Sequence, residues 1–69
     1  MLCPRCDGEG ELVKARIIKT GTTLYLCDEC EATWFSIEDV GQTPFVDYGT
    51  YMEENGLRPL WDELNVEER

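Results

Sequence analysis

The feature that most constrains this chain is its cysteines, which come as two pairs with two residues between the members of each pair. Cys3 and Cys6 form the first pair, and Cys27 and Cys30 form the second. Two intervening residues allow a tight turn that aims both sulfurs at one point, and the separation of the pairs fits a four-cysteine zinc site. The chain holds no histidine that would compete for the metal. We therefore expect these four thiolates to bind one structural Zn²⁺ ion.

Three other uses of paired cysteines fit the sequence less well. A thioredoxin-type dithiol needs its cysteine pair at the start of a helix in a βαβ unit, and neither pair has that context. Two structural disulfides need an oxidising compartment, and no apolar targeting segment follows Met1 and Leu2. Iron suits a tetrahedron of sulfurs as zinc does, so an iron-containing, rubredoxin-like electron carrier stays an alternative.

The length of 69 residues favours a single domain that needs stabilisation beyond its core, from disulfides or a bound metal. A core of this size rarely supplies more than about 3–5 kcal/mol, and the free energy of binding a structural zinc is also folding free energy. No apolar run approaches the ~20 residues of a membrane span. We expect a cytoplasmic protein that makes no membrane contact and is a monomer or a weak dimer.

The charge is strongly acidic and unevenly placed. The formal net charge is −9, and residues 27–69 hold twelve acids against two cations. Such a surface repels phosphate backbones and attracts basic proteins. The composition therefore favours a basic protein partner, or simply solubility, over nucleic acid.

Alternating apolar residues predict a β-hairpin between the two cysteine pairs. Its strands cover residues 11–20 and 22–27, with a turn centred on Gly21. Residues 32–37 are also β-prone and predict a short third strand. In the first strand, Val13, Ala15 and Ile17 share one face.

The C-terminal part of the sequence predicts one or two helices. Residues 43–56 have a plausible N-cap in Thr43, a proline at the first helical position and a stripe of Phe45, Tyr48 and Met52. Residues 59–69 predict a second, short helix. Four aromatic residues are assigned to the core, and Tyr51 or Phe35 to the surface; the core set is Trp34, Phe45, Tyr48 and Trp61.

Two family resemblances follow from these motifs. CPRCDGEG matches the repeated unit of the DnaJ-type cysteine-rich domain, but CDECEATW has Ala32 and Trp34 where that unit carries glycines, so we set that family aside. Residues 3–40 resemble the small bacterial zinc ribbons of the transcription-factor-IIB type, in the segments CPRC, LVKARIIKTGTTLYL, CDECEATWF and SIEDV. Asp7 and Glu31 stand where those proteins usually carry glycines. The resemblance implies a rubredoxin-like zinc ribbon with the four cysteines as ligands.

Together these observations predict a small α+β domain stabilised by metal. A zinc ribbon over residues 1–40, with a β-hairpin and a short third strand, would carry a helical acidic extension over residues 41–69. With no histidine and no nucleotide-binding or nucleophile motif, we expect a non-enzymatic protein-interaction module. The alternative, a nucleic-acid-binding or transcription-related ribbon, would use a basic hairpin surface made of Arg5, Lys14, Arg16, Lys19 and Tyr25.

Overall fold

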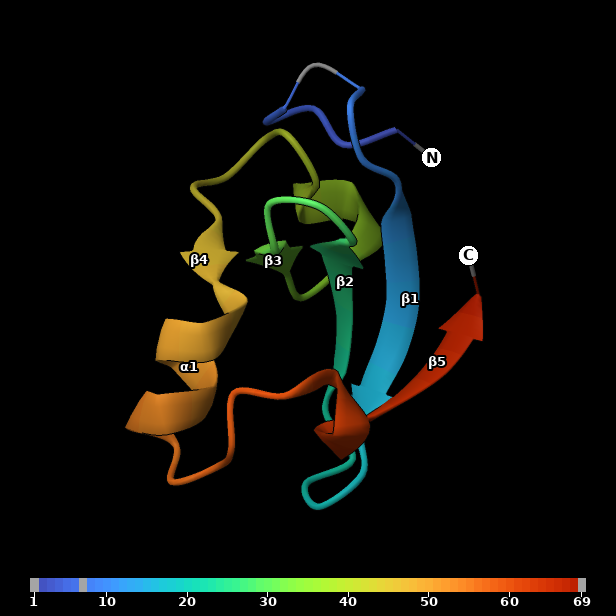
Figure 1. Ribbon diagram of the computed structural model, residues 1–69. Helices are drawn as coiled ribbons and strands as arrows, with labels where there is room; N and C mark the ends of the chain where they lie inside the picture. Colours follow the sequence, from blue (N-terminus) through green and yellow to red (C-terminus); the bar gives the residue numbers. More distant parts are fainter. Residues whose placement is uncertain (1, 7, 69) are drawn as a thin grey trace.

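The computed structural model describes residues 2–6 and 8–68, and it contains one antiparallel sheet of five strands in the order β4-β3-β2-β1-β5 (Figure 1). The strands are β1 (Leu12–Ile17), β2 (Thr23–Cys27), β3 (Ala32–Trp34), β4 (Val46–Asp47) and β5 (Leu64–Glu68). One α-helix and two short 3₁₀ helices complete the fold: α1 (Tyr48–Glu54), η1 (Ile37–Asp39) and η2 (Trp61–Glu63). Residues 41–69 thus contribute two strands to the sheet that residues 1–40 begin.

The predicted hairpin is confirmed in its strands, turn and faces. β1 and β2 pair with Lys14 opposite Tyr25 and Ala15 opposite Leu24. Gly21 lies in the turn at φ +77°, a conformation that glycine adopts without the steric cost of a side chain. The alternation works as expected over most of the hairpin, because one face is buried and Lys14, Arg16 and Tyr25 on the other are at least partly exposed. At the cysteine end of that second face, Leu12 and Cys27 are buried as well.

The first C-terminal helix is shorter than predicted, because it begins at Tyr48 and Thr43 is not its N-cap. Asp47 caps it instead, accepting a hydrogen bond from the Thr50 N–H at 3.0 Å. The residues before it are held in extended form, since Val46 pairs with Thr33 and Asp47 pairs with Ala32. The residues predicted to form the first turn of the helix therefore pair with β3 as a strand instead.

The prediction of a second C-terminal helix is wrong. Only Trp61–Glu63 form a 3₁₀ turn, and the chain continues as strand β5, antiparallel to β1. Leu64 lies opposite Ile17 and is buried, so it extends the buried face of β1, whereas Val66, opposite Ala15, stays 37% exposed. This long-range pairing outweighs the weak β-propensity of a strand rich in acids.

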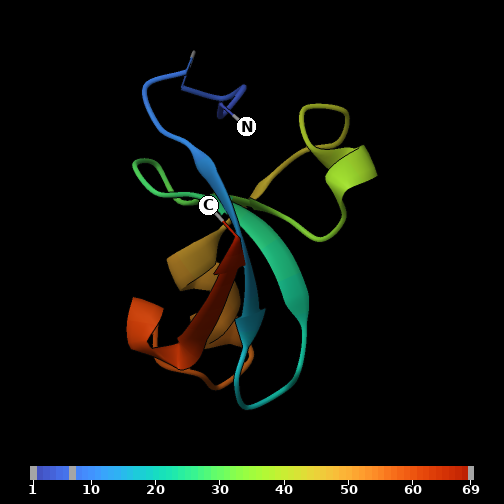
Figure 2. The ribbon, with the colours of Figure 1, turned by 90° about the vertical axis from the view of Figure 1, so that its right-hand side faces the viewer.

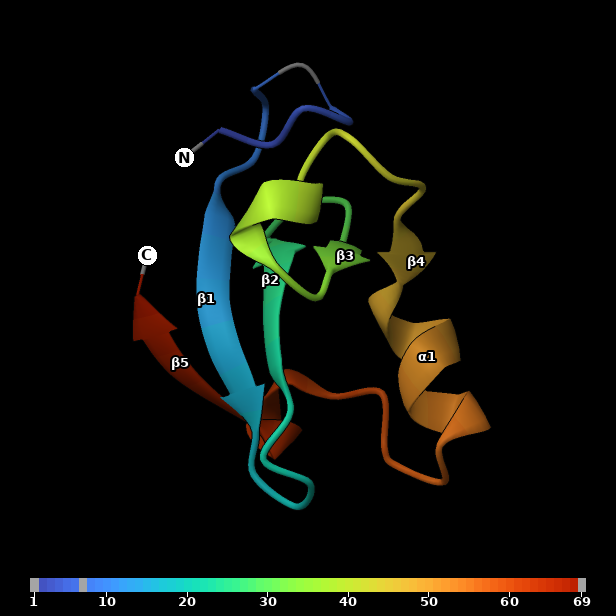
Figure 3. The ribbon, with the colours of Figure 1, turned by 180° about the vertical axis from the view of Figure 1, so that it is seen from behind.

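The sheet is covered on both faces (Figure 2). α1 and η2 lie on one side, and η1 lies on the other, in front of the sheet in Figure 3. The larger core fills the α1 side, where Trp61 is partly buried; its buried members are Val13, Ala15, Ile17, Leu24, Leu26, Tyr48, Met52 and Leu64. A second core surrounds the cysteines and contains Trp34.

Three of the four predicted core aromatics are in or against these cores, but Phe45 is not. Its side chain is 39% exposed, and its ring contacts Trp34 from outside with a centroid distance of 6.1 Å. Phe45 precedes β4 and so lies outside the helix stripe that assigned it to the core. Phe35 is 41% exposed, as expected for one of the two aromatics assigned to the surface.

Candidate metal centre

The fold brings the four cysteine sulfurs together at one end of the sheet. All four Sγ atoms lie within 4.8 Å of one another. Cys3 Sγ lies 3.8 Å from Cys30 Sγ, and Cys6 Sγ lies 3.7 Å from Cys27 Sγ. A metal about 2.3 Å from four tetrahedral sulfurs would separate those sulfurs by about 3.8 Å. The thiols are therefore spaced as ligands of one ion, and they are too far apart to be disulfides.

Backbone hydrogen bonds shape each cysteine pair into a tight turn. In the first turn the Gly8 N–H donates to the Cys3 carbonyl at 3.0 Å, and Gly8 has the positive φ of +83°. In the second turn the N–H groups of Glu29 and Cys30 donate to Cys27 Sγ at 3.3 and 3.4 Å. Such donors stabilise the thiolate form that a metal needs.

Two groups hold the turns against each other. The Glu11 N–H donates to Asp28 Oδ1, and the Asp28 N–H donates to the Glu11 carbonyl, both at 3.0 Å. This reciprocal pair joins the end of the first turn to the start of the second. It uses the backbone N–H and carbonyl of Glu11 with the backbone N–H and side-chain carboxylate of Asp28, so it joins the two cysteine pairs through protein groups.

Gly10 is required by close packing against a sulfur. A Cβ atom at this position would lie 2.4 Å from Cys27 Sγ and 2.9 Å from Glu29 Cβ. The DnaJ-like glycine spacing of CPRCDGEG thus has a local explanation here. Gly8 allows a positive φ, and Gly10 allows the second pair to approach.

The thiols differ in their electrostatic surroundings. Burial raises the pKa of the Cys27 thiol to about 12. Burial also acts on Cys30, but there the Ala32 N–H, the Cys27 thiol and the Arg5 side chain outweigh it and lower the pKa to about 7. Metal binding deprotonates its thiol ligands, so loading this site would release protons.

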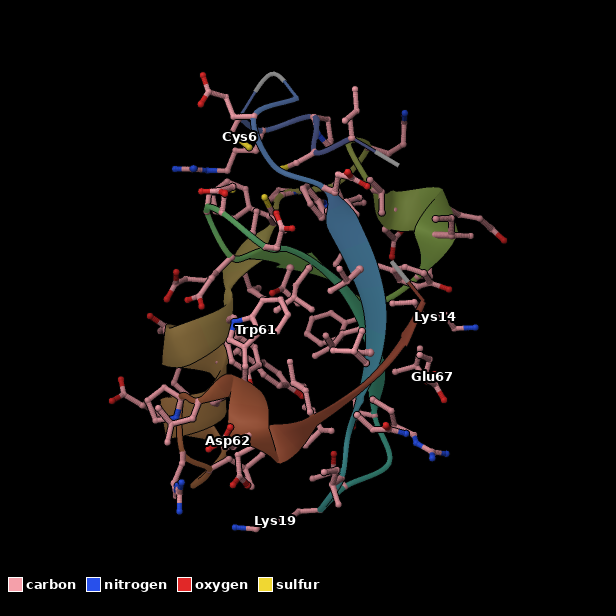
Figure 4. The ribbon with its side chains drawn as sticks, turned by 45° about the vertical axis from the view of Figure 1, so that its right-hand side comes forward. Cys6, Lys14, Lys19, Trp61, Asp62 and Glu67 are labelled. Atoms are coloured by element: carbon pink, nitrogen blue, oxygen red, sulfur yellow. The ribbon has the colours of Figure 1, made fainter. Side chains whose placement is uncertain are left out.

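Glu31 follows the last cysteine in a conformation that favours glycine, at φ +60°. Its carbonyl accepts from the Tyr48 N–H at 3.2 Å, and its Oε2 atom accepts from the Trp61 indole N–H at 2.9 Å. Figure 4 shows Trp61 pointing into the space between η2 and the sheet. Glu31 therefore connects the four-cysteine site with α1 and η2.

The five predicted contact residues do not form one surface. Lys14, Arg16 and Tyr25 share the sheet face away from α1, as the alternation predicts. Lys19 lies at the far end of the hairpin from Cys6 (Figure 4), with its Nζ atom 3.2 Å from Glu63 Oε1.

Arg5 completes the set and is also engaged within the chain. Its guanidinium carbon lies 4.7 Å from the centre of the Phe45 ring. With Lys19 paired to Glu63 and Arg5 stacked on an aromatic ring, only two of the four predicted cations share the sheet face with Tyr25.

Glu63 is a buried carboxylate beside two cations, an arrangement common in functional sites, and the sequence analysis did not select it. It is 9% exposed and lies between two cations, Lys19 and Arg58, whose Nε lies 3.9 Å from Oε2. The Lys19 contact has the distance of an ion pair but not the geometry of a directed hydrogen bond. Because both cations are more than half exposed, we assign the group to local structure. The sequence analysis expected Glu63 in an acidic helix, where its side chain would be exposed, so its burial was not predicted.

Comparisons with family models, with curated proteins and with solved structures found no match to this chain. No helix within residues 2–6 and 8–68 is long and apolar enough to cross a membrane. The site is therefore interpreted from its own geometry, in which a four-cysteine metal centre is the arrangement that the residues fit.

Proposed function

We propose that this chain is a zinc-stabilised protein-interaction module without enzymatic activity. The main support for the proposal is that all four cysteine sulfurs face one point, with distances of 3.7 and 3.8 Å between sulfurs of the first and the second cysteine pair. Four protein ligands complete the tetrahedron of a structural zinc site, whereas catalytic zinc keeps a position open for water. The metal would then act by stabilising the fold, as the rubredoxin-like ribbon suggested by residues 3–40 would require.

The second core supports this structural role. Leu12, Ala32 and Trp34 pack around Cys3 and Cys27, which are both buried. A metal held here would cross-link the first turn, the end of β2 and the start of β3. Its binding free energy would add to a core that is small for an independent domain.

The acidic charge supports a basic protein as the partner. With a net charge of −9, the chain would attract a basic partner at long range, and salt would weaken the attraction. Nucleic acid is the weaker alternative, because Lys19 and Arg5 make contacts within the chain and leave Lys14 and Arg16 as the cations beside Tyr25. Too few cations remain for strong phosphate binding.

The test is an affinity pull-down from source lysate treated with nuclease, at low and moderate salt, with elemental analysis of the bait. We expect one zinc per chain and a salt-sensitive basic protein that survives nuclease. Recovery of nucleic acid that nuclease removes would contradict the proposal and favour the hairpin surface. Stoichiometric iron would instead support the electron-carrier alternative.

A further inference from the structure

Phe35 and Tyr51 form an aromatic pair at the surface. Their ring centroids are 5.0 Å apart, with an angle of 53° between the ring planes. Phe35 directly follows β3, and Tyr51 lies on α1. Phe35 is 41% exposed, so the pair presents aromatic surface that the chain itself does not cover.

Tyr51 anchors the pair to the rest of the molecule. Tyr51 is partly buried and packs against the larger core. Its carbonyl accepts from Asn55 Nδ2 at 2.7 Å, which fixes the last turn of α1 beneath it. A surface that is already ordered loses little conformational entropy when a partner binds.

The chain segment that carries this pair is acidic. Residues 27–57 contain β3, β4 and α1, which lie at one edge of the sheet (Figure 1), and η1, which lies on the sheet face opposite α1. They include no lysine or arginine. Glu54 follows Tyr51 by three residues on α1, so it projects from the same side of the helix. The span holds eight acids: Asp28, Glu29, Glu31, Glu38, Asp39, Asp47, Glu53 and Glu54.

The molecule contains an internal example of the contact that such a surface favours. Arg5 lies over Phe45, another partly exposed ring of the same acidic span, at 4.7 Å. A guanidinium stacks on an aromatic face and keeps its charge for nearby carboxylates. Phe35 and Tyr51 offer rings of the same kind, and no Arg or Lys from within residues 27–57 can cover them.

We propose that the Phe35–Tyr51 pair is the docking point for an arginine side chain on a basic segment of a partner protein. The inference rests on the proposed function, which it deepens by naming the surface and the residue type recognised. Cation–π contact would supply specificity for arginine, and the carboxylates of residues 27–57 would supply long-range attraction. A phosphate-bearing partner does not fit, because the same carboxylates would repel it.

The test measures binding of fluorescent nona-arginine and nona-lysine peptides to the zinc-loaded chain by anisotropy. Phe35→Leu removes the exposed ring and keeps an apolar side chain, while Phe35→Tyr restores a ring. Phe45→Leu is the matched control, because Phe45 is similarly exposed but already contacts Arg5. We expect Phe35→Leu to weaken nona-arginine binding by about fivefold or more, with Phe35→Tyr close to the unmodified chain.

Nona-lysine should bind more weakly than nona-arginine and respond less to Phe35→Leu, because lysine stacks less well on aromatic rings. Equal losses in Phe35→Leu and Phe45→Leu, or no loss in either, would overturn the proposed surface. The pull-down separates this failure from that of the proposed function. A basic protein that Phe35→Leu captures as well as the unmodified chain would leave the interaction module standing and refute the docking point.

Discussion

The Trp61 indole N–H donates to Glu31 Oε2 at 2.9 Å, across 30 residues of sequence. Glu31 directly follows the last cysteine, and Trp61 opens the turn that leads into β5. The contact therefore ties the C-terminal strand to the metal centre. It also gives a reason for a glutamate at φ +60°, where glycine would avoid steric strain.

A double-mutant cycle tests whether the hydrogen bond between Glu31 and Trp61 stabilises the fold. Glu31→Ala removes the acceptor, and Trp61→Phe removes the donor while keeping an aromatic ring. We expect a coupling energy of about 1 kcal/mol, because the hydrogen bond is to a charged group that is partly exposed. Urea unfolding of the four zinc-loaded proteins measures it. Strictly additive losses would show that the two side chains do not stabilise each other.

Gly10 and Gly21 provide a matched pair of glycines. A Cβ at Gly10 would lie 2.4 Å from Cys27 Sγ, whereas a Cβ at Gly21 would meet nothing within 4 Å. Gly21→Ala should cost about 1 kcal/mol through its positive φ alone. Gly10→Ala should cost about 1–3 kcal/mol by overpacking and should weaken zinc binding as well.

Competition with a zinc-binding dye, together with thermal melts, separates these effects. Gly21→Ala should keep the zinc affinity of the unmodified chain. A Gly10→Ala variant with unchanged affinity would mean that Cys27 moves without cost, contrary to the packing described above.

Tyr48 should ionise only at high pH. Burial, followed by the negative charges of Glu31 and Glu63, raises its pKa to about 12. Because the folded pKa lies above the unfolded one, the neutral phenol contributes stability below about pH 10, and this is lost as pH rises toward 12. Absorbance titration should show a tyrosinate step near pH 12 that is missing from Tyr48→Phe. A titration curve that Tyr48→Phe leaves unchanged above pH 11 would contradict this assignment.

Cys27→Ser tests the dependence of the fold on the metal. Cys27 is fully buried at the end of β2, and its sulfur accepts two backbone N–H groups. Loss of one ligand removes much of the metal's contribution to folding, so we expect the variant to be largely unfolded by circular dichroism. A melt unchanged from the original chain would exclude a structural role for the site.

The sequence predicted the parts of this molecule that depend on local patterns. The cysteine spacing indicated the four sulfurs, and the alternation of Val13, Ala15 and Ile17 gave the correct buried face. The C-terminal third depended on contacts between distant residues. Leu64 becomes part of a strand because Ile17 lies opposite it, and no local signal records that pairing.

The same reasoning explains what was missed at the site. Glu31 was noted only as a departure from a glycine, because its partner Trp61 is distant in sequence and was expected in a helix. Lys19 was grouped with Lys14 by proximity in sequence. Its contact with Glu63 arises only because η2 packs against the end of the hairpin, where the Ile18 N–H donates to the Glu63 carbonyl.

The most direct test of the central claim is the metal content and thiol count of the purified chain. We predict one zinc per chain, and four thiols that react with a thiol reagent only after a chelator removes the metal. Chelation without denaturant should also abolish the circular dichroism of the folded sheet. A chain that is folded, free of metal and still has four reactive thiols would contradict the account.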